Sequence, residues 1–147
     1  MIIKTFPPSM ADEVKDLVLG VLKEHGFEYD PTKDFDLDDI DVQYLQSGGN
    51  FYVGLVDGMM IGTSAVRRID DKKCEIKRIY VKKEFRGRGF GRDLFLKALG
   101  FARQNYSIAV LKTDAKLTDA ITLYLKNGFS VVKEEDGIVY FEISLLM

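Results

Sequence analysis

The nine residues EFRGRGFGR at positions 84–92 alternate glycine with larger side chains and include three arginines. They follow a predicted strand and precede a predicted helix. The N-terminus of a helix exposes unpaired N–H groups at the positive end of the helix dipole, and glycines let a phosphate approach those groups without a Cβ in the way. Arg92, in the first turn, is unfavourable beside that dipole unless an anion is present. The stretch therefore predicts an anion-binding turn.

Two common nucleotide-binding loops do not fit these residues. The dinucleotide pattern GxGxxG would need glycine at position 92, which is arginine, and the P-loop pattern GxxxxGK followed by Ser or Thr does not occur in the chain. What remains is an R-x-x-G-x-G pattern formed by Arg86, Gly87, Arg88, Gly89, Phe90 and Gly91. Two glycines at a fixed spacing are a weak signal alone, so the flanking elements have to support the assignment.

Hydrophobic spacing and turn residues predict the elements that position this loop. Strands are expected at 2–6, on both sides of the Asp57-Gly58 turn, and at 74–81, 108–111, 129–133 and 138–145. Helices are expected from about Ser9 to Gly26, with Ser9 and Asp12 as a capping box, after Asp36 as a possible cap, from Gly91 or Arg92 through Ala102, and through Ala120–Leu125. The order predicts one α+β or mixed α/β domain with a central sheet over residues 1–147.

The strand EIKRIYV at 75–81, the glycine loop and the segment AITLYLKNGF at 120–129 together resemble the GNAT superfamily of N-acetyltransferases, which use acetyl-CoA. The predicted strand order is also that of this superfamily. The resemblance spans essentially the whole chain and is strongest from Cys74 to Phe129. It implies a mostly antiparallel sheet of about seven strands flanked by about four helices, and transfer of an acetyl group to a primary amine of a small molecule or peptide.

The resemblance also implies roles for individual residues. Cofactor binding would involve Ile79, Tyr80 and Val81, with the backbone of Ile79 and Val81 pairing with the pantetheine arm like an added strand. The pyrophosphate would lie against the N–H groups from Gly87 through Arg88, Gly89 and Phe90 to Gly91, with Arg86 positioning the loop. One departure from the family pattern is Leu117, where an asparagine often stands.

Two side chains carry the chemistry that the resemblance implies. Glu75 occupies the position of a general base, and a partly buried carboxylate is suited to take a proton from an alkyl ammonium whose pKa is about 10.4. Tyr124 would lie near the thioester sulfur, where a phenol can protonate or hydrogen-bond the departing thiolate. Purely structural roles remain as alternatives, because Glu75 can be a solvent-facing ion-pair residue and Tyr124 can be a core residue.

Composition narrows the remaining function classes. The chain carries 46% hydrophobic residues and a formal charge of −2, which argue for a soluble protein and against a nucleic-acid partner. It has no apolar run long enough for a membrane span and no secretory signal, so a cytoplasmic location is expected. One cysteine, Cys74, and one histidine, His25, predict neither a disulfide nor a metal site.

The partners are less determined by the sequence. Residues 27–41 carry seven acids against one lysine, which would attract a cationic amine, so a polyamine, an amino acid or a peptide amine is a possible acceptor, although a solvated surface is the simpler interpretation. A homodimer through Ile138–Leu145 is possible by the same resemblance. Two rival functions are a noncatalytic acyl-CoA-binding or sensor module, which would bind the cofactor without turnover, and a nucleotide-phosphate protein of another fold.

Overall fold

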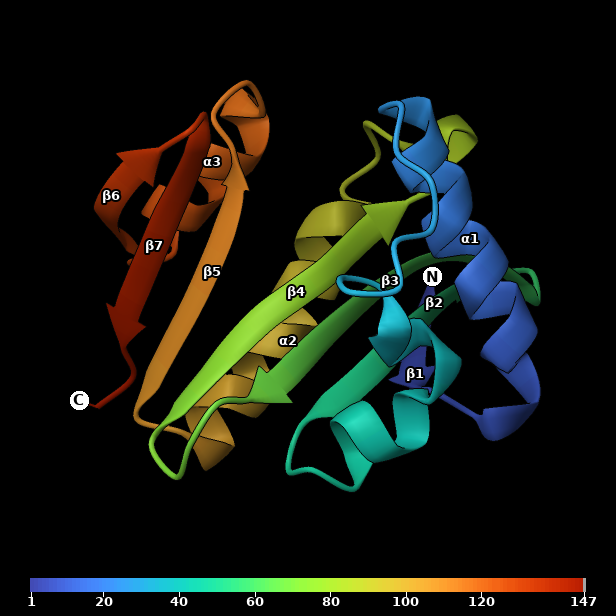
Figure 1. Cartoon of the computed structure of the whole chain (residues 1–147), viewed down its shortest axis with the longest axis horizontal. Coiled ribbons are helices and arrows are strands. Elements are labelled where there is room, and N and C mark those ends of the chain that lie inside the picture. Colours follow the sequence, from blue (N-terminus) through green and yellow to red (C-terminus); the bar gives the residue numbers. More distant parts are fainter. Residues whose placement is uncertain (147) are drawn as a thin grey trace.

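The computed structural model describes residues 1–146 and contains one seven-stranded sheet (Figure 1). Its strands lie in the order β1-β2-β3-β4-β5-β7-β6. They span β1 Ile2–Thr5, β2 Asn50–Val56, β3 Met59–Arg68, β4 Lys73–Val81, β5 Ile108–Asp114, β6 Ser130–Glu135 and β7 Ile138–Ser144. All neighbouring pairs are antiparallel except β4 and β5, which are parallel.

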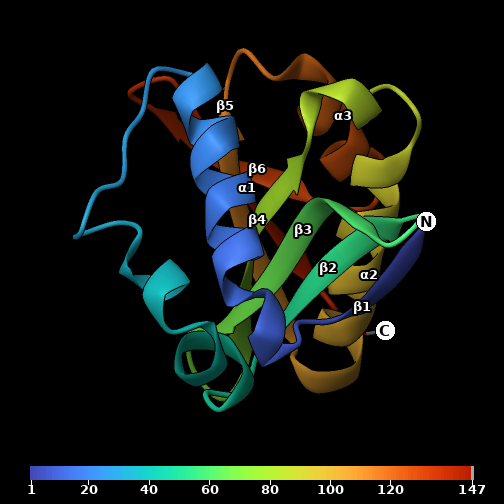
Figure 2. The ribbon, with the colours of Figure 1, turned by 90° about the vertical axis from the view of Figure 1, so that its right-hand side faces the viewer.

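Helices cover both faces of the sheet (Figure 2). Helix α1, Ala11–Glu24, packs its apolar side on β3 and β4, and its Val14 and Val18 share one core with Phe51 of β2 and Ala65 of β3. Helices α2, Phe90–Asn105, and α3, Thr118–Lys126, contribute to a second core on the other face. The predicted fold class, a mostly antiparallel sheet of seven strands with flanking helices, is confirmed.

Strands β4 and β5 separate soon after they begin to pair. Their parallel register covers only Lys73–Glu75 against Ile108–Val110, and beyond it the two strands diverge (Figure 1). On its other edge β4 continues to pair with β3, but the register shifts between Thr63 and Ala65, opposite Arg78. Arg78 has a φ of +56°, a left-handed conformation that is costly for a residue with a Cβ. This bulge bends β4, as an extra residue in one strand of a pair does, and leaves an open edge toward β5.

Three local predictions were wrong. Ser9 does not cap α1, because Pro8–Met10 forms a 3₁₀ turn and the cap position falls on Met10, without a side-chain hydrogen bond. Asp36 does not cap a helix either, because its carboxylate is buried and binds Arg78 and Tyr44. The short second helix is a 3₁₀ turn, Phe35–Asp38, followed by a π-helical turn, Asp41–Leu45.

The C-terminal strands are also arranged in a way that the chain order does not reveal. Strand β7 lies inside the sheet with β5 on one edge and β6 on the other, so β6 is the edge strand. Any pairing of strand edges between two copies at this end would therefore use β6, and the predicted homodimer through Ile138–Leu145 remains a prediction. In the part of the chain that is described, no helix is long and apolar enough to cross a membrane.

Candidate active site

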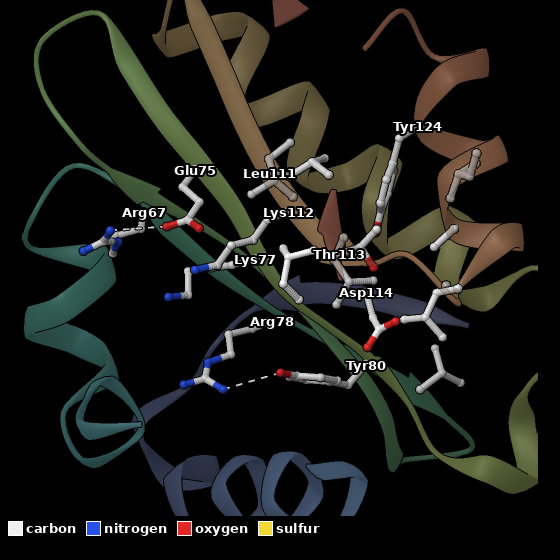
Figure 3. Close-up of a pocket in the computed structure, with 18 of the residues that line it drawn as sticks. Arg67, Glu75, Lys77, Arg78, Tyr80, Leu111, Lys112, Thr113, Asp114 and Tyr124 are labelled. Carbon is white, nitrogen blue, oxygen red and sulfur yellow. Dashed lines mark hydrogen bonds and ion pairs between the residues drawn. The ribbon is translucent and has the colours of Figure 1, made fainter. Parts of the chain in front are cut away.

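A cleft of about 1170 Å³ opens where β4 and β5 diverge (Figure 3). Its walls are β4 from Glu75 to Val81, β5 from Leu111 to Asp114, and the start of α3, with the segment 32–36 at one side. Eight basic and five acidic side chains line it, which gives the cleft a formal charge of +3, although the whole chain carries −2. The cleft is therefore suited to a ligand that carries several negative charges.

The glycine loop lies beside this cleft, between β4 and α2. Gly87 and Gly89 have φ values of +78° and +84°, which only glycine adopts without strain, and Gly89 is the N-cap of α2. Within residues 1–146, the backbone N–H groups of residues 87–92 donate to no backbone carbonyl, whereas Asp93 already donates to Gly89. Six consecutive unpaired N–H groups thus lie at the N-terminus of a 16-residue helix, an arrangement that suits an anion, and anion binding by this turn remains a prediction.

Arg86 ties the loop to its surroundings. Its Nε donates to the carbonyl oxygen of Val81 at 2.9 Å, and its guanidinium forms an ion pair with Glu24 of α1 at 2.7 Å. The side chain thus joins the end of β4 to the end of α1 and fixes where the loop begins. These contacts support the positioning role that was predicted for Arg86.

Glu75 projects from β4 into the cleft at its narrow end. Its side chain is 13% exposed and pairs with Arg67, which lies directly opposite on β3, at 3.2 Å. The same face of β4 carries Lys77, whose pKa is lowered mainly by burial. Glu75 is therefore neither fully solvated nor isolated, and it lines the cleft.

Tyr124 stands on the opposite wall, in α3, with its ring in the core and its hydroxyl end directed into the cleft (Figure 3). The ring packs against Phe95 at 5.1 Å between centroids and against Phe141 at 5.6 Å. Burial raises the pKa of the phenol to about 12. Tyr124 is thus both a core residue and a cleft residue, and its hydroxyl stays protonated at neutral pH and can donate a hydrogen bond.

A buried ionic network forms the side of the cleft nearest to α1, and sequence reasoning did not find it. Arg78 pairs with Asp34 at 3.0 Å and with Asp36 at 2.7 Å, and Tyr44 donates to Asp36. Burial alone would raise the pKa of Asp36, but the hydrogen bonds from Arg78 and Tyr44 outweigh it and lower that pKa. The network attaches the segment after α1 to the bulge in β4.

The predicted site residues fall into two groups. Glu75, Ile79, Tyr80, Val81, Arg86, Gly91 and Tyr124 line the cleft. Gly87, Arg88, Gly89 and Phe90 lie in the adjoining loop and its helix start, where Arg88 stacks over Phe85 at 5.4 Å. Leu117, the departure from the pattern, is the N-cap of α3 and also lines the cleft. No cluster of His, Cys, Asp and Glu among residues 1–146 is arranged to hold a metal ion.

The sequence profile of the acetyltransferase (GNAT) family matches residues 16–129. The chain belongs to this family. GNAT enzymes share acetyl-CoA-dependent transfer as their general reaction, so the chain is an acyltransferase. Its family and its fold also remove the rival interpretation as a nucleotide-phosphate protein of another fold, and they favour an enzyme over a noncatalytic sensor.

The curated relatives of this GNAT chain include N-acetylaspartate synthetases and members of the N-acetyltransferase 8 group. The N-acetylaspartate synthetase of Danio rerio is 36% identical over 104 residues, which cover 69% of this chain and 37% of that protein. N-acetyltransferase 8 of Mus musculus is 36% identical over 106 residues, or 67% of this chain and 47% of that protein. The chain thus spans less than half of the length of either relative.

Solved structures show the same GNAT fold over nearly the full length. A GNAT acetyltransferase from Staphylococcus aureus Mu50 superposes with a TM-score of 0.86 at 25% identity, covering 99% of both chains. A putative acetyltransferase from Salmonella typhimurium, solved with its cofactor acetyl-CoA, has a TM-score of 0.81 at 18% identity and covers 100% of this chain and 95% of that one.

Proposed function

We propose that this chain transfers the acetyl group of acetyl-CoA to a primary amine of a small molecule or peptide, by direct attack of the amine in a ternary complex. The observation that carries the proposal is one continuous cleft that joins an unpaired strand edge, an anion-binding turn and two groups able to handle protons. The relatives named above support an amine acceptor, and a cytoplasmic location remains an expectation.

The residues of the cleft fit coenzyme A. The edge of β4 around Ile79 and Val81 has no partner strand among the described residues, so it can pair with an extended amide-containing chain as an added strand does. The carbonyl of Val81 already accepts from Arg86, which leaves the backbone of Ile79 as the freer acceptor. The unpaired N–H groups of 87–92 would hold the pyrophosphate.

Acetyl-CoA supplies a thioester whose thiolate is a fair leaving group, and the protein supplies position and proton transfer. Glu75 takes the proton from the ammonium form of the acceptor, directly or through a water molecule, so that the nitrogen lone pair can form the new C–N bond. As the C–S bond breaks, Tyr124 gives its proton to the departing thiolate and takes up the remaining extra N–H proton of the new amide, so that coenzyme A leaves as the thiol. Most of the rate enhancement should come from holding the two reactants together, which can be worth roughly 7–11 kcal/mol.

Thermal stabilisation by acetyl-CoA, coenzyme A and ATP tests the cofactor first. Both coenzyme A forms should raise the melting temperature, and a variant with Arg86→Ala and Gly89→Ala should lose the shift. An equal or larger shift with ATP would contradict the proposal. A screen of amines for thiol release then tests turnover, and unchanged turnover and pH profile in Glu75→Gln would remove Glu75 from its role as the base.

A further inference from the structure

A cluster of three basic side chains surrounds Glu75 at the narrow end of the cleft. Arg67 comes from β3, Lys77 from β4 and Lys112 from β5, and all three line the cleft (Figure 3). Cys74, Ile76 and Leu111 point into the α2 core, so Lys77 and Lys112 share with Glu75 the opposite face of the sheet. The side chains of Arg67, Lys77 and Lys112 therefore form one positively charged cluster on this face of the sheet.

These cations are not balanced within the chain. Glu75 pairs with Arg67. The nearby carboxylates of Asp34 and Asp36 are taken by Arg78. In residues 1–146, neither Lys77 nor Lys112 makes a hydrogen bond or an ion pair. The pKa of Lys77 is lowered, first by burial, so the site holds an ammonium group at a cost that a bound anion would offset.

The phosphates of coenzyme A do not account for this cluster. The predicted anion-binding turn begins beyond Val81, and Val81 lies four residue steps along the strand from Lys77, which is roughly 13 Å at 3.3 Å per step. Lys77 is also next to Glu75, the proposed base, and therefore at the end of the cleft where the acceptor reacts. The anion has to come from the acceptor.

The acidic segment gives weaker support to a cationic acceptor than its composition indicates. Of the seven acids in residues 27–41, Asp34 and Asp36 pair with Arg78, and Asp38 pairs with Lys15. Three of these seven acids are therefore already neutralised within the chain, and the attraction of a cationic amine by this segment stays a weaker prediction. The unbalanced charge at the reacting end is positive.

We propose that Lys77 and Arg67 form a carboxylate-binding subsite, and that the acceptor is an amine which also carries a carboxylate, such as an amino acid. This inference rests on the proposed function, because it describes the acceptor of that reaction. The carboxylate pairs with Lys77 and with the guanidinium hydrogens of Arg67 that Glu75 leaves free, and this places the amine beside Glu75. A charge-assisted pair of this kind typically changes binding by about 10- to 100-fold.

Matched acceptors test the subsite through turnover. We expect lysine to be acetylated with a higher kcat/KM than cadaverine, and alanine with a higher kcat/KM than alaninamide, at neutral pH. Lys77→Met keeps the length of an unbranched side chain and removes its charge. It should raise KM for the acids about 10-fold or more, leave KM for acetyl-CoA unchanged, and bring the acid-to-neutral ratios toward one. Lys4→Met, an exposed lysine on the far edge strand, is the control and should change none of these values.

A binding measurement separates this inference from the proposed function. Succinate, which has no amine, should stabilise the coenzyme A complex of the wild-type protein more than succinamide does, and Lys77→Met should abolish the difference. If this difference is seen but no amine is acetylated, the subsite stands and the proposed function fails. If amines are acetylated but cadaverine is preferred to lysine, or if Lys77→Met affects acids and neutral amines equally, the subsite is refuted and the proposed function stands.

Discussion

Replacement of Arg78 by methionine should destabilise the protein strongly, because it leaves two buried carboxylates without a cation. The side chains of Arg78, Asp34 and Asp36 are 6%, 8% and 7% exposed, so water cannot replace the guanidinium. Removing one partner from such a pair costs about 3–5 kcal/mol. At roughly 2–4 °C per kcal/mol for a domain of about this size, the melting temperature should fall by roughly 6–20 °C. Methionine is unbranched like arginine, so the left-handed backbone at position 78 is equally strained in both proteins.

The loss should depend on pH in a defined direction. In the wild type the pKa of Asp36 is lowered, so its contribution to stability is present above its unfolded pKa of about 3.9 and is lost as the pH falls through the folded pKa. In Arg78→Met, burial without a cation raises that pKa, and the penalty is relieved when Asp36 takes up a proton. The difference in unfolding free energy between the two proteins should therefore shrink as the pH falls from 7 toward about 4.

Urea unfolding of both proteins across this pH range measures the effect. Arg68→Met is the matched control, because Arg68 pairs with Asp71 at the surface, with side chains 41% and 94% exposed, and such pairs are worth about 0–1 kcal/mol. An Arg78→Met loss no larger than that of the control, or one that stays constant from pH 7 to about 4, would refute the account of Arg78 as the cation of a buried network.

Three further predictions concern the site and the core. Gly89→Ala and Gly58→Ala both place an L-residue at a φ near +80°, at a cost of roughly 1–2 kcal/mol, but calorimetry should show weaker acetyl-CoA binding only for Gly89→Ala, because Gly58 lies in the β2–β3 turn. Tyr124→Phe should lower turnover and leave the acetyl-CoA dissociation constant nearly unchanged; a loss of binding instead would make Tyr124 a packing residue. Cys74 is fully buried and its pKa is raised to about 12 by burial, so a thiol reagent should modify it only at the rate of unfolding; rapid modification of the folded protein would contradict its placement in the core.

The sequence predicted those parts of the site that depend on neighbours along the chain. The glycine loop was recognisable because a strand, a turn and a helix start follow one another within a few residues, and the left-handed glycines are a local requirement. The ionic network was not recognisable, because Arg78 and Asp36 are 42 residues apart and nothing in the strand EIKRIYV or in the acidic segment indicates that they pair. The acidic segment was interpreted as a surface charge for the same reason, because composition does not show which of its acids are buried.

The bulge at Arg78 links two features of the cleft, the open edge of β4 and the position of the segment that carries Asp34 and Asp36. A regular β4 would keep pairing with β5 to its end, because β5 is itself held along its whole length by β7. The left-handed residue bends β4 beyond the point where its pairing with β5 has ended, while β4 still pairs with β3, and this keeps open the edge that a ligand can occupy. Because the side chain of the same residue anchors the segment with Asp34 and Asp36, the width of the opening and the position of the acceptor wall are fixed together. A backbone strain that is unfavourable by itself is thus stabilised by the ion pairs, and it produces the cleft.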